Sequence, residues 1–259
     1  MGVTRVKLVY FSPTGTSGKT AEAVAMGVGV EHSHVDLTPP DAGSHRFKAD
    51  ELAIIAAPVY GGRVPTTAAE RLRRLEGDGA PAVVVAVYGN RAYEDALLKL
   101  RDIAVERGFR PMAGAAFIGE HSYDTPETPI ATGRPDRANL EKAMAFGAKV
   151  KAKLGRLTEI TELAVPGNRP YRERKPRSPT SPVTDQRCIT CGRCAMVCPT
   201  GAITVGDRVE TDAEKCTRCC ACVKECPVDT RLWDDPEVKR VAVWLAADYS
   251  ERREPEVFL

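Results

Sequence analysis

Cysteine is absent from the first 187 residues of this 259-residue chain, although the chain as a whole contains nine. Long apolar runs are absent too: the longest, residues 52–60 and 80–88, are nine residues each, about half of the ~18 that a membrane-spanning helix needs. The formal charge of +2 is too small to indicate a nucleic-acid partner. These absences argue against a membrane span and a nucleic-acid-binding protein, and they divide the chain into two chemically different parts.

The composition is otherwise typical of a globular protein. Hydrophobic residues make up 43% and charged residues 28% of the chain, which is enough to bury a sizeable core in one or two domains. Near the N-terminus, Arg5 and Lys7 directly precede a short strand-like run, without the apolar segment and cleavage site of a signal peptide. We therefore expect a cytoplasmic protein, in which clustered cysteines more often bind metal than form disulfides.

The cysteine-free part alternates between strand-like runs and helical periodicity. Apolar residues recur with helical spacing in residues 96–104 and 140–154. Continuous runs rich in branched residues, typical of strands buried on both faces, occupy residues 6–11, 52–57 and 83–88, with a weaker run at 113–118. A short strand around residues 33–37 completes the set of five. This alternation of strands and helices predicts an α/β fold with a five-stranded, doubly wound parallel sheet, because parallel neighbours need crossover helices.

All nine cysteines lie between Cys188 and Cys226, and eight of them form two copies of one pattern. Each copy has three cysteines at intervals of three residues, then a fourth that is followed by proline. The copies are Cys188, Cys191, Cys194 and Cys198, and then Cys216, Cys219, Cys222 and Cys226. This spacing is typical of two [4Fe-4S] clusters in which the fourth cysteine ligates the other cluster. We therefore assign one cluster to the first triplet with Cys226, and the second cluster to the second triplet with Cys198.

A zinc ribbon and a disulfide framework are the alternatives for these cysteines. Zinc uses two pairs of ligands, usually with a longer spacer, and needs neither the third cysteine step nor the proline. The ninth cysteine, Cys220, is interpreted as a small buried hydrophobic residue, with an alternative ligand or a redox thiol as the other interpretations. Residues 202–211 between the two copies predict a short hairpin that covers the clusters.

A loop rich in hydroxyls and glycine joins the first strand-like run to the first helix. It consists of Ser12, Pro13, Thr14, Gly15, Thr16 and Ser17, and such a loop at a helix N-terminus can hold a phosphate. A nucleotide P-loop requires glycine where the chain has Pro13, and the dinucleotide fingerprint requires glycine where it has His32. The remaining pattern, Ser-x-Thr-Gly-x-Ser, resembles the phosphate loop of flavodoxins, which implies FMN as the ligand.

Two further loops follow the third and fourth strand-like runs, at the edge of a parallel sheet where ligands bind. Each offers an aromatic residue, glycine and polar groups. The first comprises Pro58, Val59, Tyr60, Gly61, Gly62, Arg63 and Val64, and the second Tyr88, Gly89, Asn90, Arg91 and Tyr93. Either loop alone could be a plain turn with packing tyrosines, but three loops in this order on one edge favour FMN.

The whole chain resembles the bacterial and archaeal family in which a flavodoxin-like domain precedes a two-cluster ferredoxin domain. The resemblance rests on the loops and both cysteine motifs described above, on residues 120–136, and on residues 254–259. It implies a flavodoxin-like sheet followed by a small α+β ferredoxin domain that holds the clusters.

We expect four segments on this basis. They are a flavodoxin-like FMN-binding domain at 1–160, a basic proline-rich linker at 161–182, a ferredoxin domain at 183–232, and a C-terminal helix with a docking tail at 233–259. Within the linker, residues 166–182 contain five prolines and a local charge of +4. This composition predicts a stiff, solvated spacer, with a docking strip for an acidic electron-transfer partner as the alternative.

The resemblance implies an electron-transfer protein with two [4Fe-4S] clusters and FMN that serves protein redox partners. Clusters pass single electrons, whereas FMN holds one or two, so the pair would convert between one- and two-electron partners. Two alternatives stay open: an FMN-dependent reductase of a small substrate, and a ferredoxin adaptor that has lost FMN. No catalytic residue is identified. His121 and Arg134 are candidates for the flavin edge, with a loop histidine and a helix-start arginine as the alternatives. The sequence does not indicate an oligomeric state.

Overall fold

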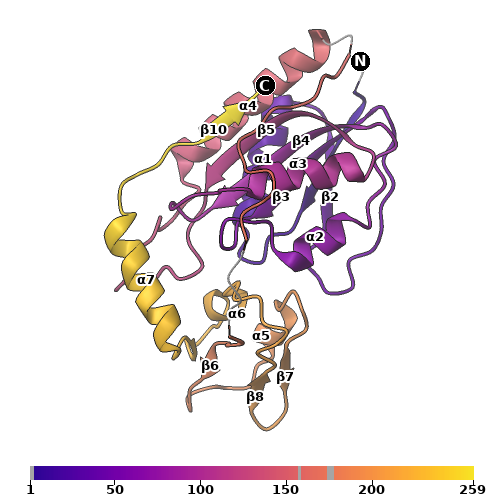
Figure 1. The fold of residues 1–259 in the computed structure, drawn as a ribbon. Helices are drawn as coiled ribbons and strands as arrows, with labels where there is room; N and C mark the ends of the chain where they lie inside the picture. The colour runs from indigo at the N-terminus through magenta and orange to yellow at the C-terminus, as the bar shows by residue number, and fades with distance from the viewer. Residues whose placement is uncertain (1–2, 157–158, 174–177) are drawn as a thin grey trace.

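The computed structural model of the chain describes residues 3–156, 159–173 and 178–259. An α/β domain is followed by a small cysteine-rich lobe, and a C-terminal helix leads from that lobe back to the α/β domain (Figure 1). The last residues then rejoin the sheet of the first domain.

A parallel sheet forms the centre of the first domain. Its strands are β1 (Arg5–Tyr10), β2 (His32–Asp36), β3 (Glu51–Pro58), β4 (Pro81–Tyr88) and β5 (Arg110–Ile118), with β10 (Glu256–Phe258) antiparallel to β5. The order β2-β1-β3-β4-β5 is that of flavodoxin-like folds. Strands β3 and β4 are buried along their whole length because helices cover both faces of the sheet. The predicted five-stranded, doubly wound sheet is confirmed, and β10 is an additional edge strand.

Two layers of helices cover this sheet. Helices α1 (Thr16–Val28) and α4 (Arg137–Arg156) pack on one face, and α2 (Thr66–Leu72) and α3 (Ala96–Glu106) pack on the other. Helices α1 and α4 approach closely at two glycines. A Cβ atom on Gly27 would lie 1.9 Å from the carbonyl oxygen of Met144, and one on Gly147 would lie 2.0 Å from that of Val24. Only glycine permits this close approach. The packing on α4 holds α1, the helix that begins at the phosphate loop, in position.

The cysteine-rich lobe is a small α+β unit, as predicted. It contains β6 (Val183–Thr184), α5 (Arg193–Met196), β7 (Ile203–Val205), β8 (Val209–Thr211), α6 (Ala221–Lys224) and β9 (Arg231–Leu232). Strands β7 and β8 pair as the expected antiparallel hairpin, and β6 pairs with β9.

The segment expected to be a solvated spacer is largely exposed where the structure describes it, but its backbone is also hydrogen-bonded to the first domain. The Asp95 carboxylate accepts hydrogen bonds of 2.8 Å from the backbone N–H groups of Asn168 and Arg172. Burial opposes ionisation of Asp95, but these hydrogen bonds outweigh it and hold the pKa of Asp95 below its usual value. The Tyr171 hydroxyl donates to Asp102. Residues 174–177 of the expected linker lie outside the described residues.

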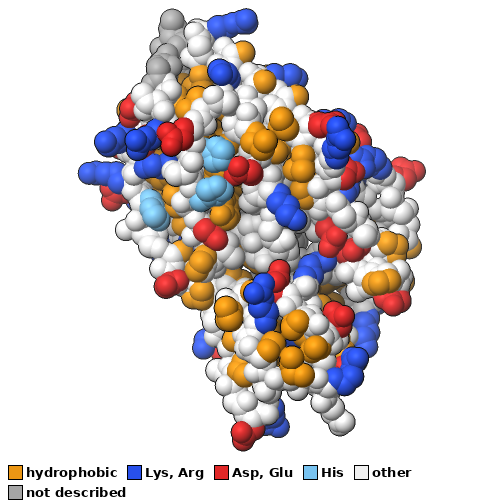
Figure 2. All heavy atoms as spheres, turned by 180° about the vertical axis from the view of Figure 1, so that it is seen from behind, with side chains coloured by type: hydrophobic (Ala, Val, Ile, Leu, Met, Phe, Trp, Pro, Cys, Tyr) orange, Lys and Arg blue, Asp and Glu red, His pale blue; other side chains and the backbone are white. Residues whose placement is uncertain are grey.

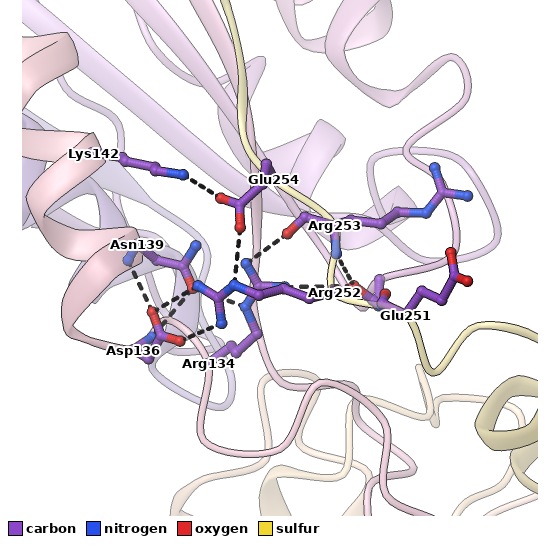
Figure 3. Close-up of polar contacts among 9 residues, drawn as sticks. Arg134, Asp136, Asn139, Lys142, Glu251, Arg252, Arg253 and Glu254 are labelled. Atoms are coloured by element: carbon purple, nitrogen blue, oxygen red, sulfur yellow. Dashed lines mark hydrogen bonds and ion pairs between the residues drawn. The ribbon is translucent and has the colours of Figure 1, made fainter.

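The C-terminal segment is fastened to the first domain by hydrogen bonds on both sides of residue 252. Helix α7 (Pro236–Asp248) is followed by a stretch of chain whose backbone carbonyls accept hydrogen bonds from two buried side chains. Asn90 Nδ2 donates to the carbonyl of Glu251 at 2.8 Å, and Arg134 donates to that of Arg253 at 2.9 Å. Figure 3 shows the contact between Arg134 and Arg253 together with the ion pairs from Arg252 to Asp136 and from Lys142 to Glu254. The C-terminus therefore docks, as expected from its sequence.

Deletion of residues 254–259 is expected to destabilise the protein by about 2–4 kcal/mol, because it removes several hydrogen bonds worth about 0.5–1.5 kcal/mol each. The melting temperature should then fall by about 5–15 °C. Removal of Leu259 alone is the control, since this residue is exposed and follows β10. Equal melting temperatures for both shortened chains would show that β10 adds no stability.

Candidate functional site

A cavity of about 270 Å³ lies where the predicted loops meet the cysteine-rich lobe. Its flavodoxin side includes ten of the predicted residues: Thr14, Thr16, Pro58, Val59, Tyr60, Gly61, Gly62, Tyr88, Gly89 and Arg91. Its other side comes from Thr217 and Arg218 of the lobe and from α7. The structure therefore brings the three loops together at one cavity and closes that cavity with the second half of the chain.

The phosphate loop has donors without partners. The loop turns at Gly15, whose φ of 79° favours glycine. The N–H of Gly18 donates to the Ser12 hydroxyl oxygen at 3.0 Å, which caps the start of α1. Within the described part of the chain, the N–H groups of Thr14, Thr16 and Ser17 make no hydrogen bond, and the buried Ser17 Oγ has no partner. A phosphate monoester would satisfy these groups.

Eight predicted residues do not line this cavity. Ser12, Pro13, Gly15 and Ser17 belong to the phosphate loop, and the other four are engaged elsewhere. Asn90 holds the C-terminal segment, and the Tyr93 hydroxyl donates to Glu256 at 3.0 Å while its ring packs 5.5 Å from that of Tyr88. The Arg63 guanidinium lies 4.4 Å from the Tyr171 ring centroid, and Val64 is buried in the core. The expectation that Asn90 and Tyr93 face a flavin ring is therefore replaced by a role in anchoring the C-terminal segment.

His121 forms part of the cavity wall as a neutral ring. Burial, with smaller effects from the charges of Lys224 and Arg91, lowers the pKa of His121 to about 4. Its Nδ1 accepts a hydrogen bond of 3.0 Å from the N–H of Tyr123. Gly89 makes room for the ring, because a Cβ atom there would lie 2.3 Å from His121 Cδ2. Arg134, the other candidate for the flavin edge, does not line this cavity and binds the C-terminal segment instead.

Two contributions to the cavity were not predicted from the sequence. The loop after β5 supplies Gly119, Glu120, Ser122 and Tyr123 in addition to His121. Helix α7 supplies Val238, Val241, Trp244 and Leu245. The apolar spacing of α7 was visible in the sequence, but it did not reveal what the helix covers.

Tyr60 lies between the cavity and the second cysteine motif. Its hydroxyl is hydrogen-bonded to Ser122, and Cys219 and Cys220 are close enough to affect its ionisation. Burial and these two thiols raise the pKa of Tyr60 well above its usual value. Thr217 lines the cavity and also the pocket formed by the second cysteine triplet. Thr217 is therefore common to the linings of the two sites.

The cysteines converge in the crossed arrangement that their spacing predicts. One pocket is lined by Cys188, Cys191, Cys194 and Cys226. Another is lined by Cys198, Cys216, Cys219 and Cys222, with the ninth cysteine, Cys220, beside them. The two fourth cysteines have matching surroundings: the N–H of Ala202 donates to Cys198 Sγ, and that of Thr230 donates to Cys226 Sγ, both at 3.3 Å. Such N–H···S bonds tune the potential of a cluster.

A buried arginine lies between the two cysteine groups. Arg231 is 3% exposed, lines the first pocket, and donates to Thr211 Oγ1 at 2.9 Å and to Cys222 Sγ at 3.6 Å. Burial raises the pKa of the Cys194 and Cys222 thiols, and the positive charge of Arg231 opposes that rise. Arg231 therefore favours thiolates in both groups.

Cys220 is buried, in keeping with its interpretation as a small core residue, but it also has a polar contact. Its Sγ accepts a hydrogen bond of 3.1 Å from the Trp233 indole N–H. Its backbone adopts a φ of 63° at the start of α6. Cys220 thus links the lobe to the chain that leads into α7.

The strand order and the crossed cysteine pockets define a flavodoxin-like α/β domain joined to a cysteine-rich α+β domain. The sequence pattern of the 4Fe-4S dicluster domain matches residues 187–230. Through these residues the chain belongs to the 4Fe-4S dicluster ferredoxin family.

Individual relatives match one domain or the other. An uncharacterized ferredoxin of Methanocaldococcus jannaschii is 47% identical over 53 residues, which cover 17% of this chain and 33% of that protein. Ferredoxin YfhL of Escherichia coli is 36% identical over 58 residues, covering 20% of this chain and 67% of that protein. A Thermosynechococcus vestitus protein described as a diflavin flavoprotein is 29% identical over 119 residues, covering 42% of this chain and 21% of that protein. The chain spans 10%, 33% and 17% of the first three curated relatives that it matches.

Flavodoxins are among the similar solved structures. A flavodoxin from the domain Archaea is 15% identical, with a TM-score of 0.39, and the match covers 59% of this chain and 99% of that one. The fold assignment itself comes from the strand order. Among the described residues, no helix has the length and apolar character that crossing a membrane requires.

Replacing Cys219 by alanine is expected to remove one cluster and leave the other, because Cys219 lies in only one of the two pockets. Iron content after anaerobic reconstitution should fall from about eight to about four atoms per chain. Cys220→Ala is the matched control, since the adjacent cysteine belongs to neither predicted set of ligands. If Cys220→Ala loses iron and Cys219→Ala does not, the ligand assignment is wrong.

Proposed function

We propose that this chain is an electron-transfer protein that passes electrons between two [4Fe-4S] clusters and an FMN bound in the cavity. FMN supplies two-electron capacity, whereas each cluster exchanges single electrons. The protein would therefore connect one-electron and two-electron redox partners.

The shared wall at Thr217 is the observation that carries this proposal. Thr217 lines both the cavity and the pocket of Cys216, Cys219 and Cys222. The phenol of Tyr60, which is among the cavity residues, lies close to Cys219. A flavin ring in the cavity would thus lie close to the second cluster, with Thr217 in the lining of both sites.

The phosphate loop supports FMN as the ligand. Its unpaired N–H groups, and the buried Ser17 hydroxyl without a partner, would bind the phosphate at the N-terminus of α1. Tyr60 and Tyr88 supply aromatic surface in the cavity, and Gly61, Gly62 and Gly89 allow close approach of the backbone.

The exposure of the cysteines favours the first cluster as the site of exchange with other proteins. Cys191 is exposed, and the neighbouring Ile189 and Met196 are 60% and 76% exposed. Cys198, Cys219 and Cys222 of the second group are buried. Electrons would then pass from a partner through the first cluster and the second cluster to the flavin, or in the reverse direction.

The cavity favours a carrier over a reductase of a small substrate. Its volume of about 270 Å³ is near the lower end of the range for a single ligand, ~300–1,000 Å³. Two candidate proton donors of its wall are not available for this role: Glu120 forms an ion pair with Lys224, and His121 is neutral near pH 7. Neither group is poised to give a proton to a substrate beside the flavin.

Rapid mixing under anaerobic conditions tests the proposed path. The holoprotein is mixed with a reduced, low-potential one-electron donor protein, and flavin absorbance is followed. We expect fast flavin reduction in the wild type and in Cys220→Ala, and slow reduction in Cys219→Ala, which lacks the intervening cluster. Equal rates in all three proteins would mean that the clusters do not feed the flavin.

Thr14→Asp is expected to weaken FMN binding about 100-fold, because a carboxylate about 4–5 Å from the phosphate adds roughly 3 kcal/mol of repulsion at an effective dielectric constant near 20. Riboflavin has the same ring but no phosphate, so its dissociation constant should be unchanged. Fluorescence titration measures both. Thr66→Asp places the same charge at the exposed start of α2 and is the control. An equal loss of FMN and riboflavin binding would place the phosphate elsewhere.

A further inference from the structure

Two histidines and a glutamate converge at the outer edge of the sheet, apart from the residues that line the cavity. His32 and His34 lie two residues apart on edge strand β2, so their side chains share one face of the sheet. Glu22 reaches them from α1. One ligating atom from each side chain lies within 4.8 Å of the other two. Figure 2 shows histidine side chains grouped beside acidic ones on this face.

The distances among these three groups suit a bound metal ion. Zinc binds imidazole nitrogen and carboxylate oxygen at about 2.0–2.2 Å, so two ligands of a tetrahedral ion lie ~3.3 Å apart. His34 Nε2 is 3.4 Å from Glu22 Oε2, and His32 Nε2 is 2.8 Å from Glu22 Oε1. Only the second pair has to separate, by about half an ångström, and the partly exposed Glu22 side chain can rotate to allow it.

Glu22 also has an oxygen atom that the protein leaves unsatisfied. Within the described part of the chain, Glu22 Oε2 is buried without a hydrogen-bond partner. A buried carboxylate oxygen without a partner is unfavourable. Its position beside His34 Nε2 is where a shared cation would satisfy both groups.

We propose that Glu22, His32 and His34 form a binding site for a divalent transition-metal ion of the zinc class. Two imidazoles and one carboxylate suit zinc, cobalt, nickel or iron(II), whereas magnesium and calcium prefer sites built from oxygen. His34 is 51% exposed and His32 24% exposed, so water can complete the coordination.

Such an ion would fasten the edge strand to the helix that carries the phosphate loop. Glu22 lies one helical turn after Gly18, whose N–H donates to Ser12 of that loop. The Tyr10 ring lies edge-on to His34 with centroids 5.9 Å apart, and it is 3.6 Å from where a Cβ atom of Gly18 would be. The site is thus connected to the start of α1 through direct packing.

Zinc binding to the cluster-loaded protein tests the site. The clusters occupy the cysteines during the experiment, and measuring iron in the same samples reports whether they remain intact. After equilibrium dialysis against micromolar zinc, the wild type should retain about one zinc more per chain than the His32→Ala/His34→Ala double variant. Glu22→Gln keeps the shape of the side chain and should weaken binding by at least about tenfold.

His45→Ala is the matched control, because His45 is an exposed histidine outside the site. It should retain as much zinc as the wild type. Zinc should also raise the melting temperature of the wild type and of His45→Ala, but not that of the double variant. Equal zinc retention by the wild type and the double variant, at equal iron content, would show that the three residues form hydrogen-bonded ion pairs only.

Discussion

Everything proposed for the electron path depends on the chain being held against the first domain on both sides of the cysteine-rich lobe. Before the lobe, the backbone of residues 168–172 is hydrogen-bonded to Asp95. After it, Asn90 and Arg134 bind the backbone that follows α7, and β10 extends the sheet. The lobe between these attachments is confined near the carboxyl edge of the sheet. This double attachment is consistent with the position of Thr217, which lines both the cavity and the second cysteine pocket.

The sequence predicted those features that are determined within a short stretch of chain. Buried strands read as continuous apolar runs, the phosphate loop is one hexapeptide, and each cluster triplet spans seven residues. The strand positions agree with the structure to within three residues at each end. Crossed pairing of the cysteines also followed from spacing, because the proline after the fourth cysteine belongs to a known pattern.

What the sequence did not predict depends on contacts between distant residues. Asn90 and Tyr93 lie in a loop that reaches the cavity, but their partners are residues 249–256, about 160 positions away. Arg134 likewise donates a hydrogen bond to a distant backbone carbonyl, that of Arg253. Because a polar side chain at a loop can bind either a ligand or a remote backbone carbonyl, residue type alone does not separate the two. The attachment of the basic segment before the lobe was not predicted for a similar reason: its hydrogen-bonding partners, Asp95 and Asp102, are some 70 residues earlier.

Joining the two domains in one chain would fix the distance between the proposed cofactors, which would otherwise have to meet by diffusion. The same arrangement would restrict access to a flavin bound in the cavity, because α7 contributes Val238, Val241 and Leu245 to the cavity wall. Electrons could pass between a partner protein and such a flavin in two ways: directly, after α7 is displaced, or through the exposed first cluster. Displacing α7 would expose apolar surface and break the attachments of residues 249–253. The first cluster would need no such change, so the geometry that would protect a bound flavin would also make the clusters its route to other proteins.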